Sequence, residues 1–245
     1  MRVRVIGCGD AFGSGGRFNT CFLVERGEAS LCLDFGATSL VALKRAGVDP
    51  GAIAAVAISH LHGDHFGGLP FLILDQMIAG RTRPLVLLGP PGLAARLEAA
   101  TRALYPGAWE AERRYGLDIR EIAPGATTPV PEIDATLTTA LVEHQSGAPA
   151  TALRLACDGR ILAYSGDTGW VDTLPGIAAG ADLFFVMCYR PGAGGEGHLG
   201  WETLAPELPA LGAKRVVLTH MSEAMLAEAA RLGLDAAQDG MTIEV

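Results

Sequence analysis

Half of the histidines in this chain lie at one point of the sequence. The stretch "AVAISHLHGDHFGGLP", residues 55–70, brings His60, His62, Asp64 and His65 into six consecutive positions, directly after an apolar run. The 245-residue chain has six histidines in all. Imidazoles and a carboxylate this close together need partners when buried, and they are ligand types of zinc, manganese and iron. The pattern therefore predicts a strand that ends in a metal-binding loop.

The spacing inside this cluster favours two neighbouring metal sites. If the strand continues through "HLH", its alternation points His60 and His62 to the same side. Gly63 then allows the chain to turn, so that Asp64 and His65 face a second point. We expect these residues to occupy an exposed loop, where functional side chains are common. A lone histidine at a strand end is usually an ordinary polar residue, but three beside an aspartate are difficult to explain in that way.

Three further candidate ligands follow other apolar runs. His144 closes "LTTALVEH", Asp167 lies in "AYSGDT", and His220 closes "RVVLTH". Taken singly, His144 is explained as a rim residue, Asp167 as a turn former, and His220 as a neighbour of the next helix. Taken together, four apolar runs each deliver a potential ligand at their carboxyl ends. That arrangement favours one shared metal centre.

The remaining periodicity predicts an α/β protein with partly antiparallel sheets. Strands are expected at 2–7, 21–36 (two strands around Gly27), 53–59, 84–89, 135–144, 150–168 (a hairpin around Asp158 and Gly159), 181–189, 214–220 and 239–245. Helices are expected at 38–45, 70–80, 90–104, 201–211 and 222–233. The segment 105–130 mixes proline, glycine and charges, and it predicts no clear element. With no repeat and no low-complexity linker, we expect one domain over residues 1–245.

Composition excludes several classes of protein. The formal net charge of −8 argues against a broad nucleic-acid surface, which requires a basic face. The five cysteines are scattered without a CxxC pair, so we expect buried thiols in a reducing compartment. The N-terminus has no continuous apolar segment of the signal-peptide type, and no run is long enough to span a bilayer. The expectation is a cytoplasmic protein without a membrane partner.

The order "HLHGDH", His144, "SGDT" and "LTH" resembles the metallo-β-lactamase superfamily over nearly the whole chain. The resemblance implies a four-layer αββα sandwich of two mixed sheets flanked by helices, with a dinuclear site at one edge. The metals it implies are two divalent ions, zinc first, with manganese or iron as alternatives. Carried over by residue, His60, His62 and His144 hold the first ion, Asp64, His65 and His220 hold the second, and Asp167 bridges both.

One more histidine indicates the branch. True metallo-β-lactamases have cysteine at the position of Asp167, which argues against β-lactam hydrolysis. His198, in "GEGHLGWETL", is similar to a proton-transfer histidine of the ribonuclease Z and cyclic-phosphodiesterase branch, although glycine-rich loops commonly hold solvated histidines. Ribonuclease Z grips tRNA with a long arm between the positions of His144 and Asp167, and only 22 residues separate these two here. A small or cyclic phosphodiester is therefore the expected substrate, and tRNA is not.

Other activities stay open on the same residues. Hydrolysis of a lactone or thioester would use the same two ions and leave His198 incidental, and a ribonuclease Z-like endonuclease without its arm is a further alternative. A non-hydrolytic binding module would be expected to lack ligands, whereas every ligand position is filled. A diiron protein of the oxygen-handling type usually carries a flavin domain, which this sequence does not show.

The residues themselves indicate a mechanism, and three others are candidates for supporting roles. Two ions supply a hydroxide at neutral pH and polarise the attacked group, Asp64 orients the nucleophile, and His198 protonates the leaving oxygen. Asp34 is expected to accept the N–H of a ligand imidazole or simply to end its strand. Arg17 and Arg190 lie in glycine-rich loops, where they would meet substrate phosphate or remain solvated. The segment 70–80 is a candidate homodimer surface or part of the core.

Overall fold

Two mixed β-sheets face each other in the computed structural model, which describes residues 1–245. The first sheet has seven strands in the order β13 (Thr242–Glu244), β1 (Arg2–Gly7), β2 (Cys21–Arg26), β3 (Ala29–Leu33), β4 (Ile53–Ala57), β5 (Leu85–Gly89) and β6 (Leu117–Glu121). The second has six in the order β12 (Val216–Thr219), β11 (Leu183–Met187), β10 (Arg160–Tyr164), β9 (Ala150–Cys157), β8 (Ala135–Val142) and β7 (Thr127–Val130). β3 to β6 run parallel, as do β10 to β12, and the other neighbours are antiparallel.

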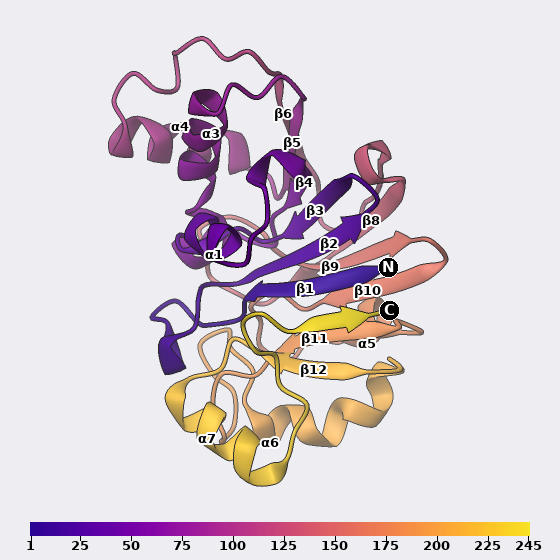
Figure 1. Cartoon of the computed structure of the whole chain (residues 1–245). Helices are drawn as coiled ribbons and strands as arrows, with labels where there is room; N and C mark the ends of the chain where they lie inside the picture. Colours follow the sequence, from indigo (N-terminus) through magenta and orange to yellow (C-terminus); the bar gives the residue numbers. More distant parts are fainter.

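Helices cover both outer faces, so the expected four-layer arrangement is observed (Figure 1). The first sheet carries α1 (Ser39–Arg45), α3 (Leu69–Ile78) and α4 (Leu93–Leu104), and the second carries α5 (Leu174–Ala178), α6 (Trp201–Leu204) and α7 (Glu223–Leu232). A single-turn helix, α2 (Gly63–Phe66), lies between β4 and α3. Short 3₁₀ turns occur at Ser14–Gly16, Pro50–Ala52, Pro131–Ile133 and Ala205–Leu211.

The alternation of each strand decides which side chains fill the layers. In β1, Val3 and Val5 point to the interior between the sheets, and the same interior receives Phe22 from β2. Phe22 stacks on Phe185 of β11 with ring centroids 4.1 Å apart, which joins the two sheets directly. Burying apolar surface of this kind is the main favourable contribution to folding. The sandwich therefore gives the strand ends a rigid support.

The middle of the chain differs from the prediction. Residues 105–130 contain β6 and β7, and each of these strands lies at the edge of a sheet. Edge strands have a solvated side and tolerate proline, here Pro129, so the apolar pattern that identifies a central strand is missing. The predicted helix at 201–211 is regular only over its first four residues. Beyond them the chain forms a 3₁₀ turn, because Pro206 and Pro209 interrupt the α-helical hydrogen bonds.

The two ends of the chain meet at one side of the first sheet (Figure 1). β13 pairs antiparallel with β1, and the Met1 amino group donates a hydrogen bond to the carbonyl oxygen of Val245 at 3.2 Å. None of the helices combines the length and the apolar character needed to cross a bilayer. All five cysteine side chains are buried.

Candidate metal centre

Four strands deliver polar side chains to one edge between the sheets. Each of these strands is followed, within three residues, by one candidate ligand. His60 follows β4, which ends at Ala57, and His144 follows β8, which ends at Val142. Asp167 follows β10, which ends at Tyr164, and His220 follows β12, which ends at Thr219. The sequence predicted that these carboxyl ends meet, and the structure confirms it. The side chains form small groups of histidines and aspartates, and within each group the possible ligand atoms lie within 4.8 Å of one another.

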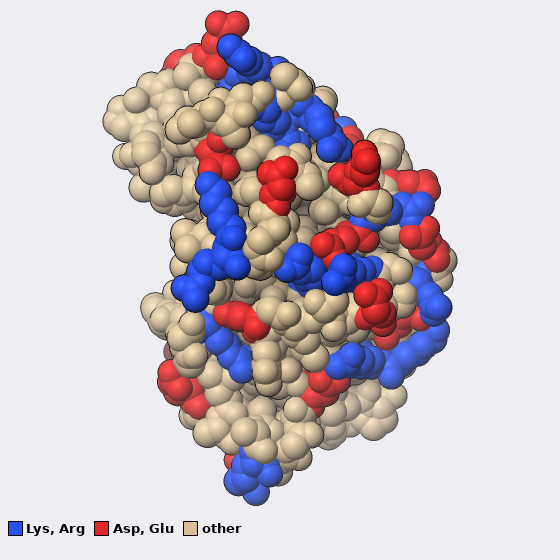
Figure 2. Space-filling model, viewed as in Figure 1, with Lys and Arg blue, Asp and Glu red and all other residues tan.

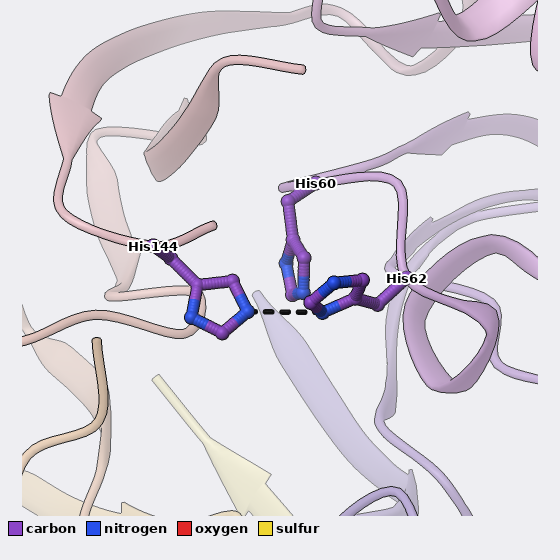
Figure 3. A group of neighbouring side chains, drawn as sticks. All are labelled: His60, His62 and His144. Atoms are coloured by element: carbon purple, nitrogen blue, oxygen red, sulfur yellow. Dashed lines mark hydrogen bonds between the residues drawn. The ribbon is translucent and has the colours of Figure 1, made fainter. Parts of the chain in front are cut away.

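The first group consists of His60, His62 and His144. Nε2 of His144 lies 3.0 Å from Nδ1 of His62, and the His60 ring is edge-on to both neighbours, with centroids 5.0 Å and 4.7 Å away. Figure 3 shows the three rings pointing toward a common centre from two separate segments. Three imidazoles with converging nitrogens form the kind of half-shell that holds a divalent transition metal.

The second group consists of Asp64, His65, Asp167 and His220. Nε2 of His220 lies 3.2 Å from Oδ2 of Asp64 and 3.1 Å from Oδ2 of Asp167. Nε2 of His65 is 3.1 Å and 3.4 Å from the same two oxygens. Asp167 also faces the first group, since its Oδ2 is 4.0 Å from Nε2 of His60. Its carboxylate therefore lies between the two groups.

The local conformation around the motif differs from the expected exposed loop. The strand does not continue into "HLH", because β4 ends at Ala57, and Asp64 and His65 belong to α2 instead. His60 and His65 are completely buried. The reason is that α2 folds back onto the first sheet, where Phe66 joins its outer core. The turn allowed by Gly63 is thus helical, and it brings Asp64 and His65 to the second group.

Asp34, which follows β3, is connected by hydrogen bonds to one histidine of each group. Its Oδ2 lies 2.7 Å from Nδ1 of His65, and its carboxylate accepts hydrogen bonds from the backbone N–H and the hydroxyl of Ser59. Because the Ser59 hydroxyl donates to Asp34, it accepts from Nδ1 of His60, 3.0 Å away. Nε2 of His60 is then left as a lone-pair donor that faces the cluster. The hydrogen bond expected of Asp34 is present, and His65 is its partner.

Two further contacts were not foreseen from the sequence. Arg96 of α4 donates to the carbonyl oxygens of Leu61 at 3.1 Å and Ser146 at 2.7 Å, and so connects the loop of His60 and His62 with the loop after His144. Nδ1 of His144 donates to the carbonyl oxygen of Gly197 at 3.0 Å. An arginine on an amphipathic helix carries no signal that separates it from the other surface arginines, so only the tertiary structure identifies it.

Buried polar atoms without partners show that the cluster fits metal ions. Nε2 of His60 and Oδ1 of Asp167 are buried and have no hydrogen-bond partner. Burying such atoms unpaired is costly, and native structures avoid it unless a ligand completes them. Imidazole nitrogens and carboxylate oxygens on one small surface are the donors that a zinc-like divalent cation satisfies.

The pKa shifts in the second group show that negative charge is concentrated there. Burial by itself raises the pKa of Asp167, but His220 and His65 outweigh it and hold that pKa well below its usual range. Burial lowers the pKa of His65, yet the carboxylates of Asp167, Asp64 and Asp34 raise it well above its usual value. For His60 burial dominates, aided by the charge of His65, and its pKa is well below the usual value. Asp167 is thus ionised, and His60 is a neutral donor.

A cleft of about 370 Å³ opens above the second group. His198 lies in its wall with one quarter of its side chain exposed, and its Nε2 is 3.5 Å from Oδ2 of Asp167. The opposite ring nitrogen, Nδ1, donates to the carbonyl oxygen of Glu196 at 3.1 Å. Arg190 also lines this cleft, with its guanidinium 5.5 Å from the centre of the Tyr189 ring.

Arg17 does not line the cleft, and its guanidinium is held by the carbonyl oxygen of Ala237 at 2.7 Å. The substrate contact suggested for it is therefore replaced by a structural one. Of the two loop arginines considered from the sequence, Arg190 is the one placed beside the cluster.

Comparison with known proteins identifies the family. Residues 33–221 match the family model described as the β-lactamase superfamily domain. A ribonuclease Z of Mycobacterium bovis is 28% identical over 193 residues, which cover 74% of this chain and 68% of the relative. Among solved structures, the short form of human tRNase Z superposes with a TM-score of 0.80 at 24% identity, covering 100% of this chain and 99% of the human one. A diphosphatase of the PhnP family gives a TM-score of 0.78 at 18% identity, covering 100% and 97% of the two chains.

The fold and the histidine–aspartate cluster therefore define a hydrolase of the metallo-β-lactamase superfamily. Within this superfamily, the ribonuclease Z of Mycobacterium bovis and the short form of human tRNase Z are proteins to which the chain is similar.

Proposed function

We propose that this protein is a dinuclear metal-dependent phosphodiesterase that acts on a small or cyclic phosphodiester. The observation that carries the proposal is the position of Asp167, whose carboxylate faces both donor groups and lies 3.5 Å from Nε2 of His198. His60, His62 and His144 would hold one ion, Asp64, His65 and His220 the other, and Asp167 both. When bound, two zinc ions supply an acidified water and stabilise negative charge on the phosphoryl oxygens.

His198 suits proton transfer to the leaving oxygen. Glu196 fixes the ring by accepting a hydrogen bond at Nδ1, so a proton on Nε2 points into the cleft. Nε2 of the same ring lies 3.5 Å from Oδ2 of Asp167. A general acid at this distance is ready to protonate an alkoxide as it departs. Asp64, which lines the same cleft, would orient the attacking nucleophile.

Several features support phosphate chemistry with a small substrate. The names of the relatives, a ribonuclease Z and a diphosphatase, both describe cleavage of phosphorus–oxygen bonds. The chain between His144 and Asp167 forms only β9, β10 and a tight turn, which leaves no projecting arm. On the face shown in Figure 2, basic and acidic side chains are interleaved, without the broad basic field that a long nucleic acid requires. The substrate proposed here is therefore a small molecule and not tRNA.

Metal content and a matched substrate screen test this proposal. The purified protein is analysed by inductively coupled plasma mass spectrometry, and it is then assayed on bis-p-nitrophenyl phosphate beside a panel of lactones and thioesters. We expect two metal ions per chain. We also expect hydrolysis of the phosphodiester, and a chelator should abolish it. Efficient hydrolysis of a lactone without phosphodiester turnover would reassign the site to carbonyl substrates, and manganese or iron in place of zinc would correct the metal alone.

A further inference from the structure

A second hollow adjoins the cleft, and His198 does not line it. This groove, of about 520 Å³, shares Asp64 and Ala11 with the cleft, and the rest of its lining differs. It is bordered by Asn19, Ala37, Gly63, Gly67, Phe71 and Leu104. The two hollows therefore extend from the same carboxylate in different directions.

The lining of the groove is apolar. Phe71 packs edge-on against Tyr105, with ring centroids 5.8 Å apart, and Leu104 beside it is 51% exposed. Gly63 and Gly67 contribute no side chain, and a Cβ at Gly63 would meet nothing within 4 Å. The exposed leucine at the end of α4 leaves apolar surface in contact with water, which a bound apolar group would remove.

The polar groups of the groove are already used by the protein. The Asn19 amide donates to the carbonyl oxygen of Asp10 at 3.0 Å, and its oxygen accepts from the backbone N–H and the hydroxyl of Thr38. Asp64 belongs to the metal-facing cluster. No other charged residue lines the groove, so the side chains that an occupant contacts there are mostly apolar.

The neighbouring cleft carries more charged side chains. Arg190, Glu196 and His198 line it, together with Phe12 and Tyr189. A phosphodiester bound at the cluster has two ester groups that point away from phosphorus. The one that leaves must lie toward His198 in order to receive its proton, and the one that stays on phosphorus is then directed to the other side.

We infer that the groove is the subsite for the retained ester group, and that this group is an apolar ring or chain. The inference rests on the proposed phosphodiesterase function. The substrate class is then a phosphodiester that joins an aryl or arylalkyl group to a more polar alcohol. Hydrolysis adds water across the bond between phosphorus and the polar oxygen, which releases the polar alcohol and leaves the apolar group as its phosphate monoester. No oxidant or further reactant is needed.

Binding of two phosphate monoesters tests the inference without relying on turnover. Dissociation constants of benzyl phosphate and methyl phosphate are measured by isothermal titration calorimetry on the zinc-loaded protein. Benzyl phosphate is expected to bind at least about tenfold more tightly, because its ring is transferred from water to apolar contacts. The replacements Leu104→Ser and Phe71→Ala are each expected to reduce this preference to below about threefold while methyl phosphate binds as before.

A matched control separates the groove from general changes in surface polarity. Ile78 lies on α3, like Phe71, and is 86% exposed but borders neither hollow, so Ile78→Ser should leave the preference unchanged. Leu104→Ser changes a half-exposed residue, and it therefore tests the groove even if Phe71→Ala unfolds the protein. Equal affinity for the two phosphates, or a preference that survives both groove variants, would overturn the inference. Absence of binding by both phosphates would instead refute the phosphodiesterase proposal and the inference with it.

Discussion

The carboxylate of Asp34 lies 2.7 Å from Nδ1 of His65, and both side chains are completely shielded from solvent. Asp34 holds this position with a left-handed backbone, at φ 57°, which asparagine also adopts readily. Ser59 joins it to His60, so one carboxylate orients an imidazole in each of the two donor groups. A small change at Asp34 should consequently affect metal binding as a whole.

Asp34→Asn is expected to weaken zinc binding about 10–100-fold, because the amide no longer fixes the orientation and basicity of the His65 ring. The measurement is zinc retained at equilibrium with a competing chelator. Asp134→Asn is the matched control, since Asp134 has a similar backbone conformation, φ 51°, but is exposed and remote from the cluster. Unchanged zinc affinity in Asp34→Asn would show that the hydrogen bond does not support the metal centre.

Arg96→Ala should also weaken metal binding, by about tenfold, because the loops of His62 and His144 lose their common hydrogen-bond donor. Zinc titration monitors the effect. Arg102→Ala, on the same helix, removes an arginine that pairs only with exposed glutamates and should be neutral. Equal behaviour of the two variants would mean that the Arg96 contact contributes nothing to the ligands.

His198→Ala is expected to lower kcat for a phosphodiester with an alkoxide leaving group by about 10²–10⁴-fold, because the leaving oxygen is no longer protonated. Zinc content should remain that of the unmodified protein. Steady-state kinetics and mass spectrometry of bound metal are measured on the same preparation. His198 also lies with His144 and Asp167 in a group able to hold an ion. Loss of zinc in parallel with activity would therefore make His198 a ligand and remove it as the acid.

The environment of Asp182 predicts how stability changes in acid, independently of the metal centre. Its pKa is lowered to about 2 by the hydrogen bond from Lys214, with further donation by the N–H of Ile161 and by Arg160. A folded-state pKa below the ordinary value of 3.8 gives stability that is complete above about pH 4 and is lost as the pH falls through about 2.

Asp182→Asn should lower the free energy of unfolding at pH 7 by about 1 kcal/mol, a value reduced by the solvent exposure of its partners. The difference from the unmodified protein should then shrink between pH 4 and pH 2. Urea unfolding at several pH values, followed by circular dichroism, measures it. A difference that stays constant down to the lowest pH would exclude the ionised carboxylate as its cause.

Much of the arrangement was predictable because it depends on local patterns. Apolar runs of alternating or continuous type identified the central strands, since burial on one or both faces leaves a periodic trace. The edge strands β6 and β7 were missed, because their solvated faces carry threonine, proline and charge. The residues His60, His62, Asp64 and His65 were evident as a cluster, yet their conformation was not. Whether "HLHGDH" continues a strand or enters a helical turn is decided by Phe66 and its packing on the first sheet.

The sequence by itself determined which residue types stand at the ends of the four strands, because a strand length and its polar terminus are local properties. Only the tertiary structure decided which of those ends meet, and at what distance. Arg96 donates to a backbone carbonyl group beside the cluster, and the carbonyl group of Gly197 accepts from His144. The groove beside Asp64 combines Phe71 and Leu104, which come from different helices. Such contacts join residues far apart in the chain, and no periodicity encodes them, because they exist only once the two sheets are packed together.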